Sequence, residues 1–587
     1  MIKYSDQVAI WLKDLGYTHY FYVGGGNIMH LTESLSRYLT GVPVVHEVAA
    51  GIAAEYFNEM SQGQRALALV TAGPGLTNIV TALSGAFLES RELLVIGGQV
   101  KTTDLAGSGL RSRGIQEVNG VELVSSTTKE SYRFLAPISA ELFAEKVSVS
   151  WTPRKGPVFL EMPLDVQAAM VEPKAISIIP HLKLPTVSEA ALQDIVKQYN
   201  SAKKPIVLIG GGVAYETTKD LQHHFQQVQA PVMTTYNGAD RVGGDDAYYL
   251  GRPNTWGQRS SNIILQEADL IIAIGTRLGL QQTGFNWQEF GRSAKIHHID
   301  IDESELKKGH PNTFSQLRVD ANDFIRRFLS QPLQKKSGWI DYCQKIRNLI
   351  PRVEPVNKTG EGFISPYQFI VDLERLTNAD DVIIPCSSGS AFTLTMQLFK
   401  QKYGQRLLTN KSLASMGYGL SGAIGASVAF GNIKRTILIE GDGGFAQNMQ
   451  ELGTADVNKL NIKIFIFNDQ GHASIRMTQV NYFSGKYLGC DRQSGLGLPN
   501  WFALFGAWNI PVTEVGPGFS GNNEFLERFE ARGLQAFLVK IDPEQTYFPK
   551  ISSRITSTGS MESNPIDKMA PEIDYLKDLP RFDSIDD

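Results

Sequence analysis

The chain has 587 residues, a formal net charge of −4 at pH 7 and an apolar content of 42%. This length predicts three or four domains rather than one, and the weak negative charge argues against a nucleic-acid-binding surface. No apolar run reaches the roughly 18 residues of a membrane span, and the first residues lack the order of a signal peptide, so we expect a cytoplasmic protein without a membrane partner. Cys343, Cys386 and Cys490 are too few and too scattered for a disulfide framework or a metal site, and we expect buried reduced thiols.

Residues 1–175 alternate between strand and helical patterns, which is typical of an α/β domain with a parallel sheet. A strand is predicted over residues 20–23. A second strand is predicted over 42–47, where it ends in the carboxylate of Glu47, and a helix follows it over 48–60.

Glycine-rich and polar turns follow the strands of this first domain. Gly24 and Gly25 follow the first strand, Gly73 and Asn78 lie in the turn after the third, and Gln116 lies in a polar loop. Glycine at such places allows a ligand or another subunit to approach the main chain closely. No cluster completes the pattern G-x-G-x-x-G, so the sequence disfavours a nicotinamide site of the Rossmann type.

A Pro- and Leu-containing linker over residues 180–186 precedes a second α/β domain, which we predict over 188–335. Apolar strands are predicted over 205–209, 270–274 and 296–302. Gly210 and Gly211 follow the first of these strands, Gly275, Thr276 and Arg277 follow the second, and Asp300 lies in the third.

A charged, Pro-containing linker over 351–362 precedes a third α/β domain, predicted over 363–545. Two of its apolar runs, 436–439 and 462–467, contain β-branched and aromatic residues with almost no alternation, which predicts buried parallel strands. A helix is predicted between them, over 447–460. The sequence therefore predicts a strand, a glycine turn, a helix and a second strand.

Each of these two strands is followed by a polar cluster. Asp442 lies among Gly441, Gly443 and Gly444, and Asp469 follows the second strand. Two carboxylates and glycine amides at the carboxyl edge of a sheet suit Mg²⁺ that holds a diphosphate. The alternative is an ordinary turn in which Asp442 caps a helix.

The remaining segments carry weaker signals. Ser388 follows another predicted strand, and Ala414 and Met416 lie in a glycine-containing stretch where an ordinary core methionine is the alternative interpretation. We expect the tail, residues 546–587, to form a surface cover or a mobile end.

The stretch around Asp442 and Asp469 resembles the GDG-to-NN motif of thiamine diphosphate (ThDP) enzymes. The resemblance implies that Asp442, Asp469 and the carbonyl of Gly471 bind Mg²⁺, and that the glycines beside Asp442 contact the diphosphate. Asp469 departs from the asparagine of the family. It is still an oxygen ligand, although it adds one negative charge.

The first domain resembles the pyrimidine-binding domain of the acetolactate synthase group of ThDP enzymes. The resemblance rests on His46-Glu47 after a strand and on the segment 71–78. It implies that Glu47 is the catalytic residue that activates the cofactor and that Gln116 lies near the reacting centre. Without the resemblance, Glu47 is equally explained as an acidic residue at a helix N-terminus, and Gln116 as a solvated loop residue.

The same resemblance covers residues 1–545 and implies three doubly wound α/β domains that are pyrimidine-binding, central and diphosphate-binding. The cofactor contacts that it implies are Gly24, Gly25, Gly73, Asn78, Ser388, Ala414 and Met416. The central domain resembles that of acetolactate synthase, which carries a structural FAD, whereas related decarboxylases keep the domain without FAD. The cofactor contacts that this resemblance implies are Gly210, Gly211, Arg252, Gly275, Thr276, Arg277 and Asp300. The resemblance further implies a homodimer or homotetramer with active sites at subunit interfaces.

The implied reaction is the decarboxylation of a 2-oxo acid such as pyruvate, with transfer of the acyl unit to a carbonyl acceptor. Acetolactate synthases read a second keto acid with an Arg and a Trp at the positions of Gln281 and Thr478. Their absence favours a bulkier acceptor, such as a keto-sugar nucleotide in branched-sugar formation. The alternatives are an ordinary acetolactate synthase, a simple 2-oxo acid decarboxylase and a non-catalytic homologue.

Overall fold

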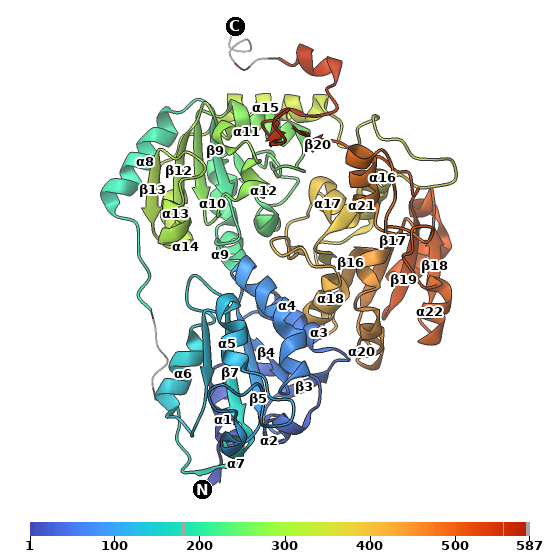
Figure 1. Ribbon diagram of the computed structural model, residues 1–587. Helices are drawn as coiled ribbons and strands as arrows, with labels where there is room; N and C mark the ends of the chain where they lie inside the picture. Colours follow the sequence, from blue (N-terminus) through green and yellow to red (C-terminus); the bar gives the residue numbers. More distant parts are fainter. Residues whose placement is uncertain (178–181, 556, 581, 583–587) are drawn as a thin grey trace.

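The computed structural model describes residues 1–177, 182–555, 557–580 and 582. Three parallel sheets flanked by helices form three α/β domains, which confirms the predicted fold class (Figure 1). The first two residues of the predicted linker 180–186 lie outside the described residues. Within the described ranges, no helix has both the length and the apolar character needed to cross a membrane.

The N-terminal domain is built on a six-stranded sheet with the order β3-β2-β4-β5-β7-β6. Its strands are β2 (Tyr17–Tyr22), β3 (Thr40–Pro43), β4 (Arg65–Val70), β5 (Leu93–Gln99), β6 (Glu130–Arg133) and β7 (Pro157–Pro163). Its helices are α1 (Tyr4–Asp14), α2 (Met29–Leu35), α3 (Glu47–Met60), α4 (Pro74–Glu89), α5 (Gly120–Val124), α6 (Ala140–Ser148) and α7 (Leu164–Ala168). An antiparallel pair, β1 (Ile2–Lys3) and β8 (Met170–Val171), joins the two ends of the domain.

The central domain has a five-stranded sheet with the order β10-β9-β11-β12-β13. Its strands are β9 (Pro205–Ile209), β10 (Val232–Thr234), β11 (Leu270–Ile274), β12 (Lys295–Asp300) and β13 (Ser315–Arg318). Its helices are α8 (Glu189–Ser201), α9 (Tyr215–Asp220), α10 (Gln222–Val228), α11 (Arg259–Glu267), α12 (Leu280–Thr283), α13 (Glu303–Lys307), α14 (Ala321–Leu329) and α15 (Ser337–Leu349).

The C-terminal domain has a six-stranded sheet with the order β15-β14-β16-β17-β19-β18. Its strands are β14 (Val382–Pro385), β15 (Arg406–Leu407), β16 (Thr436–Gly441), β17 (Ile462–Asn468), β18 (Val512–Val515) and β19 (Gln535–Lys540). Its helices are α16 (Pro366–Leu376), α17 (Gly389–Leu398), α18 (Tyr418–Ala429), α19 (Asp442–Phe445), α20 (Leu452–Val457), α21 (Ala473–Phe483), α22 (Trp501–Ala507) and α23 (Asn523–Glu530).

The tail after this domain returns to the central domain and covers part of it (Figure 1). It contains two antiparallel pairs, β20 (Lys550–Ile551) with β23 (Met569–Ala570) and β21 (Ser553–Ile555) with β22 (Met561–Ser563). Asn262 of α11 donates to the carbonyl of Ile566 at 2.9 Å, and Arg259 donates to the carbonyl of Met569 at 2.9 Å. These bonds fix the tail on α11.

The position of Glu47 differs from the prediction. β3 ends at Pro43, and Glu47 is the first residue of α3 rather than the end of a strand. His46 has the extended conformation of a helix N-cap, with φ −135° and ψ 136°. The prediction was wrong because the valines after Pro43 continue the apolar run without continuing the sheet.

The helix predicted over 447–460 is interrupted. The structure has a 3₁₀ turn over Met449–Glu451 followed by the short helix α20. The buried side chain of Glu451 in that turn accepts hydrogen bonds from the main-chain N–H groups of Val45, at 3.2 Å, and His46, at 3.0 Å. The interruption therefore coincides with a contact to the N-terminal domain, which local spacing does not reveal.

Helices α3 and α18 pack against each other and join the first and third domains into one apolar cluster. The contact is close because α18 presents glycines. A Cβ on Gly425 would lie 2.1 Å from the carbonyl oxygen of Ala53, and a Cβ on Gly422 would lie 2.6 Å from the ring of Tyr56. Small residues are therefore required along this helix pair.

A buried polar cluster, the three-domain junction, lies at the end of this helix pair. Its members are Glu55, Glu89 and Arg91 of the N-terminal domain, Asn237 of the central domain, and Asn410 and Tyr418 of the C-terminal domain. The guanidinium of Arg91 lies 2.8 Å from the carboxylate of Glu55. The hydroxyl of Tyr418 donates to the same carboxylate at 3.2 Å.

Candidate functional site

The carboxyl edges of β16 and β17 bring the two predicted aspartates together. The strands are parallel neighbours, with Gly441 opposite Phe467. Asp442 follows β16 as the first residue of α19, and Asp469 follows β17 directly. The predicted placement of both carboxylates at one sheet edge is therefore what the register produces.

Asp442 is fully buried, and its carboxylate joins both turns of the site. Its Oδ1 accepts from the main-chain N–H of Gly443 at 2.6 Å, and its Oδ2 accepts from that of Gly471 at 3.1 Å. Gly471, the third predicted metal ligand, thus lies beside the first.

Asp469 is also buried, and it pairs with a residue that the sequence interpretation did not name. The guanidinium of Arg476, on α21, lies 2.9 Å from Oδ1 of Asp469 and also donates to its carbonyl oxygen at 2.8 Å. The signal for Arg476 was present in the sequence. An additional buried carboxylate needs a cation nearby, and Arg476 lies seven residues further on.

The two carboxylates affect each other's ionisation. Burial and the neighbouring charge of Asp469 raise the pKa of Asp442 well above its ordinary range. Burial also raises the pKa of Asp469 to about 6, while Arg476 works in the opposite direction. Two buried carboxylates with raised pKa values form an environment that a divalent cation would stabilise.

The glycines of the site differ in what surrounds them. A Cβ on Gly443 would lie 2.3 Å from Nδ1 of His472, and one on Gly471 would lie 2.0 Å from the carbonyl oxygen of Cys490. A Cβ on Gly444 would lie 3.1 Å from Oε1 of Glu440. By contrast, a Cβ on Gly441 would meet no atom of the described chain within 4 Å. The protein's own packing requires Gly443 and Gly471, whereas it leaves open space at Gly441.

Two further loops reach the same edge. The hydroxyl of Ser387 donates to the carbonyl of Ser415, which joins the loop containing Ser388 to the loop containing Ala414 and Met416. The side-chain amide of Asn448 donates to the carbonyl of Gly417 at 2.7 Å and fixes this second loop to the Asp442 segment. The side chain of Met416 is not a core residue, since 37% of its surface is exposed.

Glu47 forms the second part of the predicted site. It is buried at the start of α3, and its Oε2 accepts from the side-chain amide of Asn78 at 3.0 Å. The turn at Gly73 lies against Gln116, whose Cβ would be 2.8 Å from a Cβ on Gly73. Gly73 has φ +62°, which favours glycine. A hydrogen bond thus joins Glu47 to Asn78, and Gly73 packs against Gln116.

The remaining glycines of this domain are placed differently. A Cβ on Gly25 would lie 2.4 Å from the side chain of Thr71, whereas a Cβ on Gly24 would meet no atom of the described chain within 4 Å. Among the described residues, no hydrogen bond joins Glu47 to Asp442 or Asp469.

The glycines of the central domain pack mainly against one another. A Cβ on Gly210 would lie 2.3 Å from the carbonyl oxygen of Gly275, and one on Gly211 would lie 3.0 Å from Cβ of Asn237. Thr276 follows Gly275, and its carbonyl oxygen is hydrogen-bonded to Nε2 of His298 at 2.8 Å. These turns are thus brought together at one edge of the sheet.

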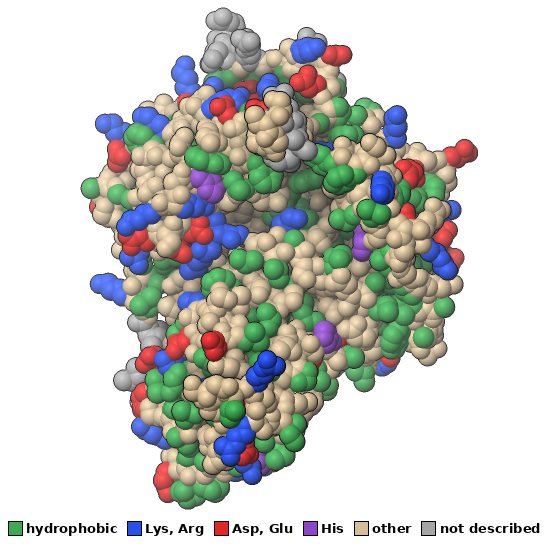
Figure 2. Space-filling view, in the orientation of Figure 1, with side chains coloured by type: hydrophobic (Ala, Val, Ile, Leu, Met, Phe, Trp, Pro, Cys, Tyr) green, Lys and Arg blue, Asp and Glu red, His purple; other side chains and the backbone are tan. Residues whose placement is uncertain are grey.

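Arg277 and Asp300 lie near the same edge. Arg277 donates to the hydroxyl of Ser412 in the C-terminal domain at 2.5 Å. Asp300 is buried at the end of β12 and accepts from the N–H of Asp302. Figure 2 shows Lys and Arg side chains gathered beside the hollow where the three domains meet.

Arg252 does not join these residues. It is buried, and its guanidinium donates to the carbonyls of Met396 and Phe399 and, at 2.8 Å, to the side chain of Gln401. All three acceptors belong to the C-terminal part of the chain. Its donors are engaged at the joint between two domains, and the flavin contact of Arg252 stays a prediction.

Gln281 and Thr478, where the sequence departs from acetolactate synthases, lie on two different helices. Gln281, on α12, donates to the hydroxyl of Thr255 at 2.9 Å. Thr478 lies exposed on α21, where its hydroxyl donates to the carbonyl of Ser474 at 2.9 Å.

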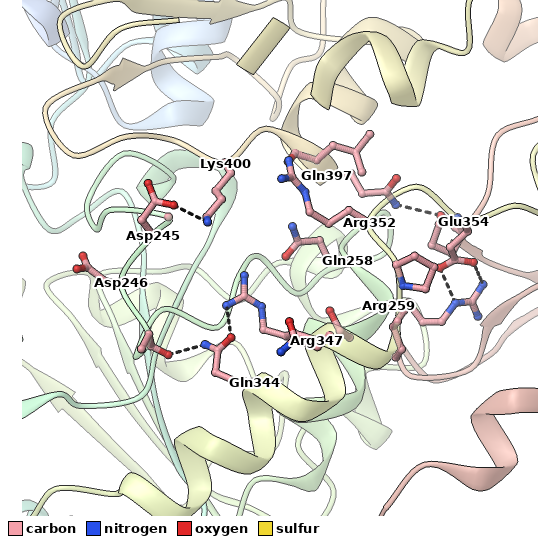
Figure 3. A pocket seen from close by; sticks show the side chains of 18 residues that line it. Asp245, Asp246, Gln258, Arg259, Gln344, Arg347, Arg352, Glu354, Gln397 and Lys400 are labelled. Atoms are coloured by element: carbon pink, nitrogen blue, oxygen red, sulfur yellow. Dashed lines mark hydrogen bonds and ion pairs between the residues drawn. The ribbon is translucent and has the colours of Figure 1, made fainter. Parts of the chain in front are cut away.

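A cavity of about 480 Å³ lies apart from all of these positions, between the central and C-terminal domains (Figure 3). Three of its cationic side chains are paired. Lys400 lies 2.5 Å from Asp245 and Arg259 lies 2.8 Å from Glu354, while Arg352 pairs with Glu374 behind the lining. The cavity shares no residue with the predicted site and is a polar part of the domain interface.

Three family models match the chain in the order of its domains. They are the thiamine pyrophosphate enzyme N-terminal TPP binding domain over residues 2–123, the central domain over 192–328, and the C-terminal TPP binding domain over 387–532. The acetolactate synthase isozyme 2 large subunit of Escherichia coli is 30% identical over 488 residues, which cover 81% of this chain and 84% of that protein. The chain belongs to the thiamine pyrophosphate enzyme family.

Other relatives of this thiamine pyrophosphate enzyme cover still more of its length. The isozyme 1 large subunit of Escherichia coli is 27% identical over 546 residues, or 91% of this chain and 93% of that protein. The probable acetolactate synthase large subunit of Methanocaldococcus jannaschii is 29% identical over 519 residues, or 84% of each chain. The chain is therefore an enzyme of this family related to acetolactate synthase.

The sheet edge of this thiamine pyrophosphate enzyme fits the diphosphate end of the cofactor with a divalent cation. Two carboxylates and a carbonyl are hard oxygen donors, which Mg²⁺ prefers. The open space at Gly441 is where a phosphate can approach the main chain.

The glycine positions give a first test. Gly441→Ala should leave the unfolding temperature of the cofactor-free protein unchanged and weaken ThDP binding by about 10- to 100-fold, the equivalent of one charge-assisted contact of about 1.5–3 kcal/mol. Gly506→Ala, on the open face of α22, is the control for both measurements. Calorimetric titration with ThDP and Mg²⁺ measures the affinity. Wild-type affinity in Gly441→Ala would show that the diphosphate lies elsewhere.

Proposed function

We propose that this protein is a ThDP- and Mg²⁺-dependent enzyme that decarboxylates a 2-oxo acid, with pyruvate favoured, and transfers the acyl unit to a carbonyl acceptor. The observation that supports it most directly is the meeting of Asp442, Asp469 and Gly471 at one sheet edge, with Asp442 bonded to Gly471 at 3.1 Å. The relationship to acetolactate synthase large subunits supports the reaction class.

In this proposal, Asp442, Asp469 and the carbonyl of Gly471 hold Mg²⁺, and the amides beside Gly441 receive the diphosphate. The bound cofactor supplies a carbon nucleophile for the 2-oxo acid and accepts the electron pair released with CO₂. Met416 is exposed beside this edge and would support the cofactor from its apolar side.

Glu47 moves the proton. Its Oε2 is held by Asn78, and its Oε1 has no hydrogen-bond donor among the described residues. We assign this oxygen to proton exchange with the pyrimidine ring of the cofactor. The retention of Glu47, Asp442 and Gly443 favours an enzyme over a non-catalytic homologue.

We further propose that the complete site forms between two chains of a homodimer, or of a homotetramer built from such dimers. The resemblance of the N-terminal and C-terminal domains to the pyrimidine-binding and diphosphate-binding domains of the family, which implies active sites at subunit interfaces, supports this arrangement. Glu451 holds the turn at Val45 and His46 and thereby fixes where Glu47 is presented.

For the acceptor, we propose a bulky ketone of the keto-sugar nucleotide class. Gln281 cannot supply the bidentate charged contact that an arginine gives to a carboxylate, which is worth about 1.5–3 kcal/mol. Thr478 is small and exposed, so it leaves room beside α21. The alternatives, formation of acetolactate or release of the free aldehyde, are outcomes of the product assay below.

We also propose a structural FAD in the central domain. The match of this domain to the family's central-domain model over residues 192–328 supports it, as does the position of Thr276, Arg277 and Asp300 near one sheet edge.

Glu47→Gln should retain ThDP binding and lose CO₂ release from pyruvate by at least about 100-fold, because an amide cannot exchange the proton. The amide keeps the shape of the side chain and its contact with Asn78. Turnover near that of the wild type, with ThDP saturating, would remove Glu47 from the mechanism. Mixed dimers of Glu47→Gln with Asp442→Ala chains should recover activity if each site uses two chains, and should stay inactive if each site lies within one chain.

Products from pyruvate with candidate keto-sugar nucleotides, identified by mass spectrometry, test the acceptor. Gln281→Arg should raise acetolactate relative to other products by about 10- to 100-fold at unchanged CO₂ release, since the acceptor contact sets the ratio of kcat/KM values. If the wild type already forms acetolactate as its main product with a saturable second pyruvate, the role given to Gln281 is wrong.

The purified protein should be yellow and should release FAD on denaturation, with no net oxidation or reduction during turnover. Absorbance spectra before and after denaturation measure this directly. A colourless protein that is fully active and gains nothing from added FAD would contradict the flavin proposal without affecting the proposed ThDP site.

A further inference from the structure

The metal position carries more negative charge than one carboxylate would give it. Asp442 and Asp469 are both buried, and they follow neighbouring parallel strands at one edge of the sheet. Two like charges in a site with little water repel each other strongly. Such a site would hold a cation well but would repel the diphosphate that must bind beside it.

Arg476 is the cation that faces this pair. Only 4% of its side chain is exposed, and it forms the ion pair of 2.9 Å with Oδ1 of Asp469. The same Nη2 donates to the carbonyl oxygen of Asp469, so one nitrogen fixes both the main chain and the carboxylate. This contact determines the orientation of the Asp469 side chain.

The guanidinium also reaches the other predicted ligand. Nη1 of Arg476 would lie 2.8 Å from a Cβ on Gly471, so it packs directly against that residue. Nε of Arg476 is buried and has no hydrogen-bond partner among the described residues. The Nε–H of Arg476 is therefore a buried donor without an acceptor among the described residues, on a side chain that contacts Asp469 and Gly471.

The local chain fixes Arg476 in this place. It lies in the first turn of α21, and its main-chain N–H donates to the carbonyl of His472 at 3.0 Å. The N–H of His472 in turn donates to the carbonyl of Cys490 at 2.8 Å. The N-terminal end of α21 is thus fixed to the segment that contains Cys490, which limits the movement of Arg476 away from Asp469.

We propose that Arg476 is a positioning residue that compensates the charge of Asp469, so that the site presents a divalent cation and a diphosphate with the net charge of a single carboxylate. The inference rests on the proposed ThDP and Mg²⁺ function. Asp469 and Arg476 then act as one unit that takes the place of a neutral oxygen ligand. Substitution of either residue alone should therefore weaken binding of the metal ion or of the diphosphate.

The two single substitutions should act on metal binding in opposite directions. Asp469→Asn leaves an unpaired cation beside the metal position and should weaken Mn²⁺ binding to the ThDP-free protein by about 10- to 100-fold, as is typical for partners of metal ligands. Arg476→Met leaves two carboxylates and should bind Mn²⁺ at least as tightly as the wild type. Electron paramagnetic resonance of free Mn²⁺ measures both affinities.

Binding of the diphosphate should distinguish a unit from two separate residues. At saturating Mn²⁺, Arg476→Met should lose about tenfold or more in ThDP affinity because the uncompensated carboxylates repel the diphosphate, whereas Asp469→Asn/Arg476→Met should return close to the wild type. Asn481→Ala, an exposed position on α21, is the matched control and should change neither affinity. Calorimetric titration with ThDP gives these values without any assay of activity.

The outcomes separate this inference from the proposed function. If the wild type fails to bind ThDP with Mn²⁺, the function itself is wrong. If the wild type binds and the double variant loses as much ThDP affinity as Arg476→Met alone, Arg476 does not act by charge compensation and the inference is wrong. Should Arg476→Met fail to fold, Arg476→Lys replaces it. Lysine keeps the charge and loses the double contact, so compensation predicts ThDP affinity near that of the wild type, and a loss of about tenfold or more would overturn it.

Discussion

The buried ion pair between Glu55 and Arg91 lies where the three domains meet, and its two side chains also bond to the other two domains. Its groups are 2.8 Å apart and almost fully excluded from water. Removal of one member of such a pair costs about 3–5 kcal/mol, because the other charge remains buried. Tyr418 bonds to the same Glu55 carboxylate and is the first residue of α18. The loop that carries Met416 immediately precedes α18, so this bond links the junction to a loop beside the candidate site.

The sequence was sufficient for the parts of the site that depend on local pattern. The apolar runs of β16 and β17 predict two buried parallel strands, and a parallel register places the residues that follow them at one edge. This is why the sequence alone predicts that Asp442 and Asp469 lie at one edge of the sheet. Asn78 and Glu47 are site residues only by the resemblance to the family. The structure joins them by a hydrogen bond, although the strand predicted to end at Glu47 ends at Pro43.

The sequence was insufficient where a side chain finds its partner far along the chain. Arg252 was interpreted as a ligand contact, but it bonds to carbonyls 144 and 147 residues further on. Glu451 interrupts a predicted helix because it bonds to main-chain groups more than 400 residues away, at a separation of 405 from His46. Arg476 was overlooked for a different reason, since its partner is only seven residues distant and the need for it lies in the charge of Asp469.

The close packing of α3 on α18 has a consequence for how the chain folds during synthesis. Glu55 and Asn410, which bond to each other at one end of this helix pair, are 355 residues apart in sequence. The ribosome makes about 5–20 residues per second, so the N-terminal domain spends on the order of tens of seconds with the apolar face of α3 uncovered. During that interval the same face can pair with an α18 that belongs to another chain. A chaperone that covers α3 during this interval should therefore raise the yield of correctly joined domains.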